Sequence, residues 1–354
     1  MPDFDVTPEK RATQRAFLKR QLFVTPPAVT RADANVEGKT AIITGSNTGL
    51  GFEAARQLVD LGISRLILAV RSETKGQLAK NKLLVGKDPD KQVVEVWPLD
   101  LSSYESVTSF VGRVKTLDRL DIFINNAGLT KLNFELNKST GHEETIQVNY
   151  LSHVLLVILL LPILKEKNSP EHPGRMVMVN SEVASWPKFK EQDSVPLLAA
   201  LDQKSNFQNQ DRYFTSKLLC QLFLFELVKR IPPTVAVINA PNPGLCISSL
   251  SREANGTFGG FAFDMIKKLI GRSTSLGART LTDAAVRHGA ESHGQYLEDC
   301  KIQPLAPIVY QPKGQKLAEQ LWKETMEELS FVGAADIIAS LSDKQVNTAA
   351  GSSS

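Results

Sequence analysis

A tyrosine and a lysine lie four residues apart in 213-YFTSK-217, within a stretch whose pattern predicts a helix. Side chains at this spacing share one face of a helix. A phenol has a pKa of about 10 and exchanges its proton poorly near neutral pH, whereas a neighbouring ammonium favours the phenolate and lowers that pKa. Tyr213 and Lys217 could therefore deliver a proton to a substrate oxygen, although the spacing alone also arises by chance on surface helices.

Three glycines follow an apolar run in 39-KTAIITGSNTGLGFEAARQLVDLG-62, and a helical pattern follows them. At such a strand-to-helix turn, Gly45 would permit the tight turn, Gly49 would let backbone approach a pyrophosphate, and Gly51 would let helix and strand pack closely. The free N–H groups of the helix start favour an anion. The segment predicts a dinucleotide cradle formed by Gly45, Ser46, Asn47, Thr48, Gly49, Leu50 and Gly51, with a tight turn that holds no ligand as the alternative.

The end of the second predicted strand, 68-LAVRS-72, indicates which dinucleotide fits. NAD enzymes usually carry Asp or Glu here to accept from the ribose 2′-hydroxyl, whereas an Arg accommodates the 2′-phosphate of NADP. Val70 occupies the expected acidic position and Arg71 follows it, so the sequence predicts NADPH/NADP+ as the cofactor. Glu73 and Lys75 are expected to be solvated at a helix start.

Short apolar runs alternate with helical stretches from Lys39 onwards. Strands are predicted at 39–44, 65–70, 92–98, 121–124, 175–180, 234–239 and 306–309. Helices are predicted at 50–61, 74–84, 104–117, 141–167, 211–231, 277–288 and 314–329. Because the strands are apolar on both faces, the pattern predicts an α/β, doubly wound (Rossmann) fold: a seven-stranded, mostly parallel sheet with helices on both faces.

Further motifs, each on its expected element, make the chain resemble the short-chain dehydrogenase/reductase (SDR) family: TGSNTGLG (44–51), LDLSS (99–103), NNAG (125–128), VNYLSH (148–153), VMVNSEVAS (177–185), YFTSK and PNPGLCIS (241–248). The resemblance implies catalytic Asn149, Ser181, Tyr213 and Lys217. It also implies cofactor contacts from Arg71, Asp100, Leu101, Asn126, Ala127, Gly128, Tyr213, Lys217, Pro243, Gly244 and Ser248.

The C-terminal segments 295-QYLEDCK-301 and 318-AEQLWKETMEEL-329 resemble the retinol-dehydrogenase-like branch of this family. The segments 20–27 and 66–76 are similar to fungal members of that branch, which are often associated with secondary metabolism. The resemblance therefore implies reduction of a ketone or aldehyde, or the reverse alcohol oxidation. Binding of NADPH for isomerisation or cyclisation, or for a regulatory role, is the alternative.

Within that reaction, the resemblance implies a role for each catalytic residue. Tyr213 donates the proton, Lys217 lowers the pKa of Tyr213 and holds the nicotinamide ribose, and Ser181 orients the carbonyl. Asn149 is expected to hold a water in a proton relay. Glu182 follows the catalytic serine, and a solvated or capping role is expected for it.

Two segments outside the cofactor motifs, 186–211 and 249–271, are rich in Phe, Leu and Trp and are expected to form the substrate pocket. Phe258, Phe261 and Phe263 stand beside glycines, which predicts a lid over the pocket. A patch buried against the core or a subunit partner is the alternative. The expected substrate is a bulky hydrophobic molecule, for which a secondary metabolite such as a polyketide is a candidate.

The composition excludes several other classes. The 354 residues are 42% hydrophobic and carry a net charge of +3, too little for a nucleic-acid surface. Three scattered cysteines and five histidines without ligand spacing predict neither disulfides nor a metal site. The apolar run 154–164 is shorter than the roughly 20 residues of a spanning helix, so no integral membrane segment and a cytoplasmic location are expected.

The domain organisation is predicted in three parts. Residues 1–38 form an amphipathic helix (8–23) and a linker, 39–334 form a single SDR Rossmann domain, and 335–354 form a partly disordered tail. The helix is expected to pack on the domain through Phe17, Leu18, Leu22 and Phe23, with attachment to a membrane surface as the alternative. The helices at 149–164 and 214–228 could pair with those of a second copy, so a homodimer is also considered.

Overall fold

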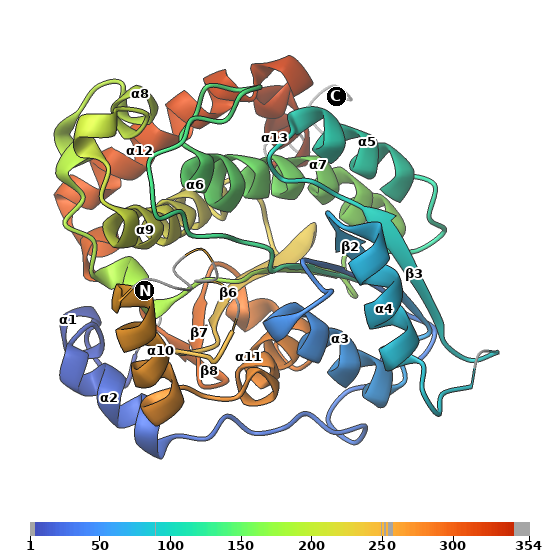
Figure 1. Ribbon diagram of the computed structural model, residues 1–354. Coiled ribbons are helices and arrows are strands. Elements are labelled where there is room, and N and C mark those ends of the chain that lie inside the picture. The colour runs from blue at the N-terminus through green and yellow to red at the C-terminus, as the bar shows by residue number, and fades with distance from the viewer. Residues whose placement is uncertain (1–3, 89, 249, 251–252, 254–257, 343–354) are drawn as a thin grey trace, which may run out of the picture.

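An eight-stranded sheet forms the centre of the part of the chain that the computed structural model describes, residues 4–88, 90–248, 250, 253 and 258–342 (Figure 1). The strand order is β3-β2-β1-β4-β5-β6-β7-β8, and all neighbours pair in parallel except β7 and β8. The strands are β1 Thr40–Thr44, β2 Arg65–Val70, β3 Val93–Pro98, β4 Ile122–Asn125, β5 Gly174–Met178, β6 Ala236–Asn242, β7 Tyr296–Glu298 and β8 Lys301–Gln303. The doubly wound α/β fold is confirmed, with one strand more than the predicted seven.

The predicted last strand at 306–309 is wrong. Pro307–Tyr310 instead forms a short 3-10 helix, η7, in which Pro307 supplies the first turn. The last two strands lie earlier, and they form an antiparallel hairpin around Asp299 and Cys300. Both turn residues have positive φ, 53° and 64°, as a two-residue hairpin turn requires.

Helices cover both faces of the sheet (Figure 1). On one face lie α3 Gly49–Leu61, α4 Glu73–Leu83 and α11 Thr274–Val286; on the other lie α5 Tyr104–Val114, α7 Ser152–Lys167 and α9 Asn209–Leu227. Serines cap several of them, because a serine oxygen accepts an otherwise unpaired N–H of the first turn. Ser103 Oγ accepts from Ser106 N at 3.1 Å, and Ser273 Oγ accepts from Leu276 N at 3.2 Å.

The helix before β5 agrees with the helix predicted at 141–167 and begins three residues later, at Glu144. It comprises α6 Glu144–Ile146, a π-helical turn η1 Gln147–Leu151 and α7. Its 24 residues are long and apolar enough to cross a membrane, but 89% of the apolar window is buried inside the protein. Burial to this extent is typical of a core helix that is packed between a sheet and outer helices.

Two C-terminal helices form an outer layer on this side, α12 Pro312–Glu328 over α9 and α13 Ala334–Leu341 over α7. Trp322 stacks on Phe223 with ring centroids 5.2 Å apart, and Tyr150 Oη lies 2.7 Å from Thr325 Oγ1. The faces of α7 and α9 that were expected to pair with a second copy are thus covered within the chain. The structure does not support that dimer interface.

The N-terminal segment forms two short helices where one was predicted over 8–23, α1 Pro8–Arg11 and α2 Gln14–Phe23. Thr7 caps the first helix, accepting from Lys10 N at 3.3 Å. Thr13 caps the second, accepting from Ala16 N at 3.2 Å. The cap at Thr13 needs extended backbone there, which interrupts the helix.

The expectation that this segment docks through its apolar side is wrong. Arg11 and Gln21 are buried, with 1% and 7% exposure, and Arg20 is partly buried. Of the expected apolar residues only Phe17 packs on the domain, against Trp186 at 5.5 Å. The others are exposed by 43%, 50% and 80%: Leu18, Leu22 and Phe23.

The segment 186–211 contributes mainly to the core. It contains the short elements η3 Lys190–Asp193, α8 Leu197–Leu201 and η4 Lys204–Asn206. Its buried apolar side chains are Phe189, Leu197, Leu198 and Leu201. Only its half-buried residues, such as Trp186 and Phe207, are left to line a substrate pocket.

The remaining described elements are η2 Glu182–Ser185, α10 Phe258–Ile270, η6 Ala290–Ser292 and η8 Ser330–Val332. Of the tail expected to start at 335, residues 335–341 lie in α13, which ends at Leu341. Residues 343–354, including the stretch expected to be disordered, lie outside the described residues.

Candidate active site

Thr44, the last residue of β1, organises the turn that follows β4. Its Oγ1 accepts from both Asn126 N and Ala127 N at 2.9 Å, and its carbonyl accepts from Asn126 Nδ2 at 2.9 Å. The turn at Asn126, Ala127 and Gly128 is thereby held against the glycine loop, at the point where the strand order reverses. Ligands of open α/β sheets bind at such switch points.

The glycine loop leaves no room for side chains on its inner side. A Cβ on Gly45 would lie 2.9 Å from Ala127 Cα, and one on Gly51 would lie 2.5 Å from Asn126 Nδ2. Gly45 also has a φ of 65°, which a residue with a side chain rarely adopts. The outer side is open: a Cβ on Gly49 would meet nothing within 4 Å. The loop can therefore receive a diphosphate on its open side, at the start of α3.

The other residues of the glycine loop follow the same distinction between a packed inner side and an open outer side. Ser46 is buried and donates from Oγ to Ile43 O at 2.8 Å, which fixes the turn from inside. Asn47 and Leu50 are half-buried and Thr48 is exposed. Thr48 is the N-cap of α3 without a side-chain hydrogen bond to the helix.

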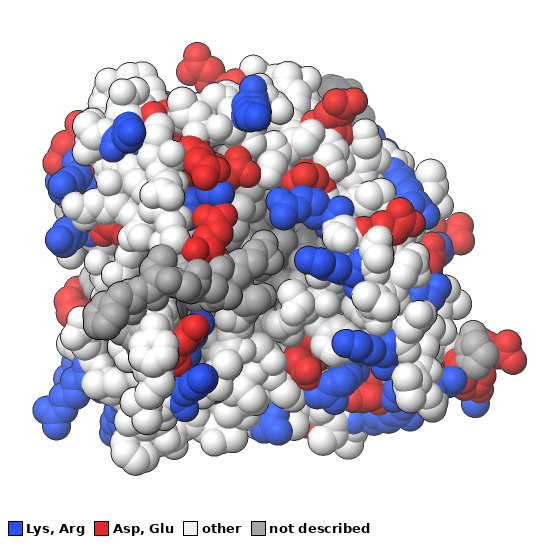
Figure 2. Space-filling model, in the orientation of Figure 1, with Lys and Arg blue, Asp and Glu red and all other residues white. Residues whose placement is uncertain are grey.

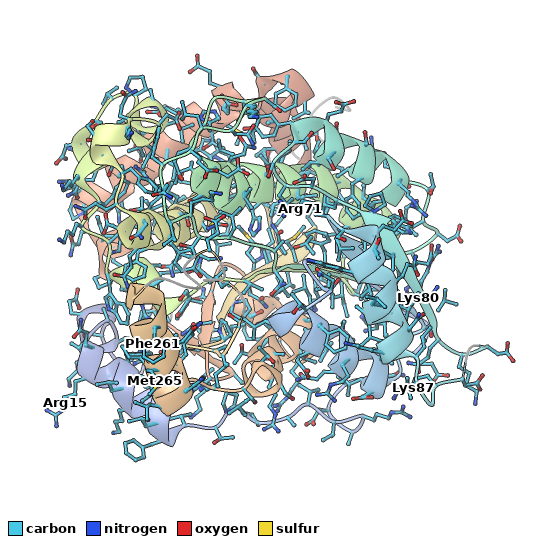
Figure 3. The ribbon with its side chains drawn as sticks, in the orientation of Figure 1. Arg15, Arg71, Lys80, Lys87, Phe261 and Met265 are labelled. Atoms are coloured by element: carbon cyan, nitrogen blue, oxygen red, sulfur yellow. The ribbon has the colours of Figure 1, made fainter. Side chains whose placement is uncertain are left out.

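Arg71 is exposed directly after β2, whereas Val70 before it is buried. Figure 3 places Arg71 towards the middle of the face that it shows, and Lys80 and Lys87 at its side. A guanidinium at this position is available to a 2′-phosphate. Asp100 and Leu101 follow β3; Asp100 Oδ1 accepts from Ser102 N at 3.0 Å, and Leu101 is buried.

Lys217 ties α9 to the end of β5. Its Nζ donates to Val179 O at 3.0 Å, and its carbonyl accepts from Asn180 Nδ2 at 3.1 Å. Ser181 follows Asn180 in the chain and is the N-cap of η2, where its Oγ accepts from Val183 N at 3.4 Å. Tyr213 lies one turn before Lys217 on α9, with Lys217 Nζ 5.9 Å from its ring centroid. The structure thus brings Ser181, Tyr213 and Lys217 to adjoining elements beyond the carboxyl end of β5.

Asn149 lies in the π-helical turn η1 and is completely buried. Its Oδ1 accepts from Leu129 N at 2.9 Å, while its Nδ2 donates to Leu129 O at 2.8 Å and to Ser216 Oγ at 3.1 Å. A Cβ on Gly128 would lie 3.3 Å from Asn149 Oδ1. Asn149 therefore connects the loop after β4 to α9, one residue from Lys217.

Burial controls the acidities in this region. It raises the pKa of the Tyr213 phenol above its ordinary value and lowers the pKa of the Lys217 ammonium. Desolvation of the phenolate is thus the largest influence on the pKa of Tyr213, and the expected lowering by Lys217 stays a prediction. Burial, together with the charge of Lys217, also lowers the pKa of His153 to about 3.

Glu182 is buried and ion-paired, which corrects the expected solvated or capping role. Its Oε2 lies 3.0 Å from Arg20 NH2, and Arg20 Nε lies 2.7 Å from Glu298 Oε2. Arg11 joins the same group, 3.5 Å from Glu298, and donates to Ser185 Oγ at 2.8 Å. Burial and the charge of Glu298 raise the pKa of Glu182. The N-terminal helices thus meet η2, which begins directly after Ser181.

Helix α2 also holds the loop at Pro243 and Gly244. Gln21 Oε1 accepts from Leu245 N at 3.1 Å, and Gln21 Nε2 donates to both Leu245 O and Ile270 O at 2.8 Å. Arg272 binds Asp299 at 2.7 Å and donates to Arg20 O and Val24 O. Pro243 is buried, Gly244 has a φ of 76°, and Ser248 is half-buried.

The proposed lid is only partly described. Phe261 lies on the outer side of α10 and is 66% exposed (Figure 3), so it does not line the site as expected. The side chains of Phe258 and Phe263 lie outside what the structure describes. The inner side of α10 instead carries Gly260 and Lys267, both buried.

Four positioning residues were missed from the sequence: Thr44, Arg20, Gln21 and Glu298. Thr44 had a usable signal, because a polar residue ended an otherwise apolar strand directly before the glycines. Arg20 and Gln21 had none, since their partners lie more than 150 residues away in the chain.

The fold and this arrangement define a Rossmann-type oxidoreductase. A family model described as short chain dehydrogenase matches residues 39–191. The short-chain dehydrogenase fogG of Aspergillus ruber is 51% identical over 343 residues, covering 96% of this chain and 98% of that protein. The short chain dehydrogenase/reductase mfmJ of Annulohypoxylon moriforme is 43% identical over 324 residues, covering 91% and 93%. The chain belongs to the short-chain dehydrogenase family.

A solved structure shows the same fold over most of the chain. The crystal structure of an uncharacterised protein from Mycobacterium paratuberculosis matches with a TM-score of 0.60 and 26% identity. The match covers 86% of this chain and 98% of that one. It includes more of the chain than the family model does.

Proposed function

We propose that the protein is an NADPH-dependent reductase that converts a ketone or aldehyde of a bulky hydrophobic molecule to the alcohol. The observation that carries this proposal is the link from Lys217 to Val179 and Asn180, which places the phenol of Tyr213 and the hydroxyl of Ser181 on adjoining elements. Such a pair can hold one carbonyl oxygen between them.

In this proposal each side chain has one task, and the nicotinamide supplies the hydride when it is bound. Ser181 donates a hydrogen bond to the carbonyl oxygen and steadies the charge that develops there. Tyr213 transfers its proton to that oxygen. The raised pKa of Tyr213 keeps the phenol protonated at neutral pH, as a proton donor must be at the start of a reduction. Lys217 holds the nicotinamide ribose and returns a proton to Tyr213, and Asn149 holds the water that links Lys217 to solvent.

The preference for NADPH rests on Arg71. A guanidinium can bind a 2′-phosphate with two parallel hydrogen bonds, and the neighbouring Val70 offers no acceptor for a 2′-hydroxyl. The shape of the glycine loop supports a dinucleotide, because its inner side is filled and its outer side is open.

The substrate class is supported by the character of the surrounding residues. The half-buried Trp186 and Phe207 offer aromatic surface beside α9, where Trp186 packs against Phe214 at 6.3 Å. The two short-chain dehydrogenases named above, fogG and mfmJ, come from fungi, and a polyketide or similar secondary metabolite is the candidate that we propose. Cys220, Cys246 and Cys300 are free thiols, which suits the cytosol as its location.

Turnover of NADPH with a panel of ketones tests the proposal. Tyr213→Phe keeps the ring and removes the proton donor, so turnover of the bulky ketone should fall by roughly 10²–10⁴-fold while NADPH affinity is retained. Tyr310→Phe, a tyrosine on η7, is the matched control and should leave turnover unchanged. NADPH binding without oxidation across the panel would instead favour isomerisation, cyclisation or a regulatory role.

A further inference from the structure

Several of the large apolar side chains exposed on the described surface lie on two neighbouring helices, α2 and α10. Six of them form what we call the α2/α10 patch: Leu18, Leu22, Phe23, Phe261, Met265 and Leu269. Phe23, Leu269 and Phe261 are exposed by 80%, 76% and 66%. Exposed apolar residues elsewhere, such as Leu78 and Val85, stand apart from this group. Contiguous apolar patches on proteins mark surfaces that bind a partner or a membrane.

The two helices of the patch form one continuous surface. Gln21 Nε2 donates to Ile270 O at 2.8 Å, and Arg272 NH2 donates to Val24 O at 2.9 Å, so the carboxyl ends of α2 and α10 are joined. Figure 1 shows the helices next to one another. Along α10, Phe261, Met265 and Leu269 recur every four residues and therefore share one face.

The charges around the patch are positive. Arg15, Lys19 and Lys268 are exposed, and Arg15 projects from the molecule in Figure 3. Helix α2 contains no acidic residue, and the one acid of α10, Asp264, pairs with Lys267 at 2.7 Å. Figure 2 shows a largely uncharged surface over α2 and α10, with Lys and Arg side chains at its edge and an acidic group beside α10. Apolar side chains next to unpaired cations are typical of surfaces that lie on anionic lipid.

We propose that the α2/α10 patch binds the protein peripherally to an anionic phospholipid bilayer. Phe23, Phe261 and Leu269 enter the boundary between headgroups and acyl chains. The stems of Arg15, Lys19 and Lys268 lie along the apolar surface, and their charged ends reach the lipid phosphates. A second copy of the chain fits less well, because a symmetric pair would bring these cations close to one another.

Vesicle flotation with the full chain tests this proposal. The probes are phosphatidylcholine vesicles with and without phosphatidylserine, each at low and high salt. We expect binding to the phosphatidylserine vesicles at low salt and weaker binding at high salt. The double variant Phe23→Ser, Leu269→Ser should lower the affinity at least about tenfold, because two large apolar side chains no longer enter the bilayer. Lys19→Glu with Lys268→Glu should abolish the preference for phosphatidylserine.

The matched control is Leu78→Ser with Val85→Ser, two exposed apolar residues outside the patch, and it should bind as the unchanged protein does. Turnover of a water-soluble ketone confirms that each variant is folded. Failure to bind either vesicle overturns the proposal, as does equal binding to neutral and anionic vesicles. A dimer in solution that Phe23→Ser dissociates, without vesicle binding, would assign the patch to a second copy instead.

Discussion

The side-chain amide of Gln21 pairs with the backbone of Leu245 in both directions, accepting from its N–H at 3.1 Å and donating to its carbonyl at 2.8 Å. The loop that begins at Pro243 is expected to contact the nicotinamide, so Gln21 acts as a positioning residue for the cofactor. Gln21→Ala should weaken NADPH binding roughly 5–20-fold through loss of these buried hydrogen bonds. Isothermal titration of NADPH measures the change.

Gln92 provides a matched control, because it donates to two backbone carbonyls, Val59 O and Ile63 O, at 2.8 and 3.1 Å. Both carbonyls lie near Gly62, the C-cap of α3, whereas the glycine loop lies at the other end of this helix. Gln92→Ala should lower the melting temperature about as much as Gln21→Ala without changing NADPH affinity. Equal affinities for the two variants would show that Gln21 serves stability alone.

Arg20 forms ion pairs with two buried carboxylates, Glu182 and Glu298. Arg20→Met should destabilise the protein by about 3–5 kcal/mol at neutral pH, because it leaves the buried carboxylate of Glu182 without its ion-pair partner, whereas Glu298 keeps Arg11. Burial and the charge of Glu298 already raise the pKa of Glu182, so the folded state binds more protons than the unfolded state. Stability therefore falls as pH rises from the unfolded pKa through the folded one, and more steeply in the variant. Urea unfolding from pH 5 to 8 measures this, and a constant difference between the two proteins would contradict it.

Arg71 is predicted to select NADPH over NADH. Arg71→Ala should weaken NADPH binding by roughly 10–100-fold and leave NADH binding nearly unchanged, because only NADPH carries the 2′-phosphate. Lys80→Ala, at a half-buried cation on α4, is the control and should affect neither cofactor. Fluorescence titration with both cofactors decides the matter; equal affinities in the unchanged protein would show that Arg71 does not discriminate.

His142 binds two carboxylates from distant parts of the chain. Its Nδ1 lies 2.8 Å from Asp202 Oδ2, and its Nε2 lies 3.2 Å from Glu328 Oε1. Burial alone would lower its pKa, but hydrogen bonds and charge from Asp202 and Glu328 prevail and raise it to about 9. The stabilisation of the folded state by protonated His142 is complete below about pH 6.5, the ordinary pKa of histidine, and is lost as the pH rises through 9.

His142→Gln should therefore lower the free energy of unfolding by about 2 kcal/mol at pH 6 and by little at pH 10. Urea unfolding at the two pH values measures the difference. His172→Gln, at an exposed histidine between α7 and β5, should change stability little at either pH. A deficit for His142→Gln that is the same at both pH values would refute the charged pair.

The sheet and the glycine loop were predictable because their signals are local. Runs such as 39–44 are apolar on both faces, and Gly45 and Gly51 fall where the backbone leaves no space for a Cβ. The docking of the N-terminal segment was not predictable, because its buried face consists of Arg11, Arg20 and Gln21. Those side chains are satisfied by partners that no local pattern indicates.

The remaining errors have the same origin. Glu182 looks solvated in the sequence, yet Arg20 from another part of the chain makes its burial tolerable. Phe261 looks like a pocket residue, but its place on the helix turns it outward. The run at 306–309 is apolar enough for a strand, but Pro307 begins a helical turn there.

The contacts of α2 also set the order of events during synthesis. Gln21 is separated from Leu245 by 224 positions and from Ile270 by 249. At about 5–20 residues per second, α2 leaves the ribosome roughly 10–50 s before these partners exist. During that interval the glycine loop and the first strands can form, but the loop that α2 must hold has not been made. A nascent chain can therefore acquire its nucleotide cradle early, whereas the finished nicotinamide side of the site appears only after Ile270 has been made.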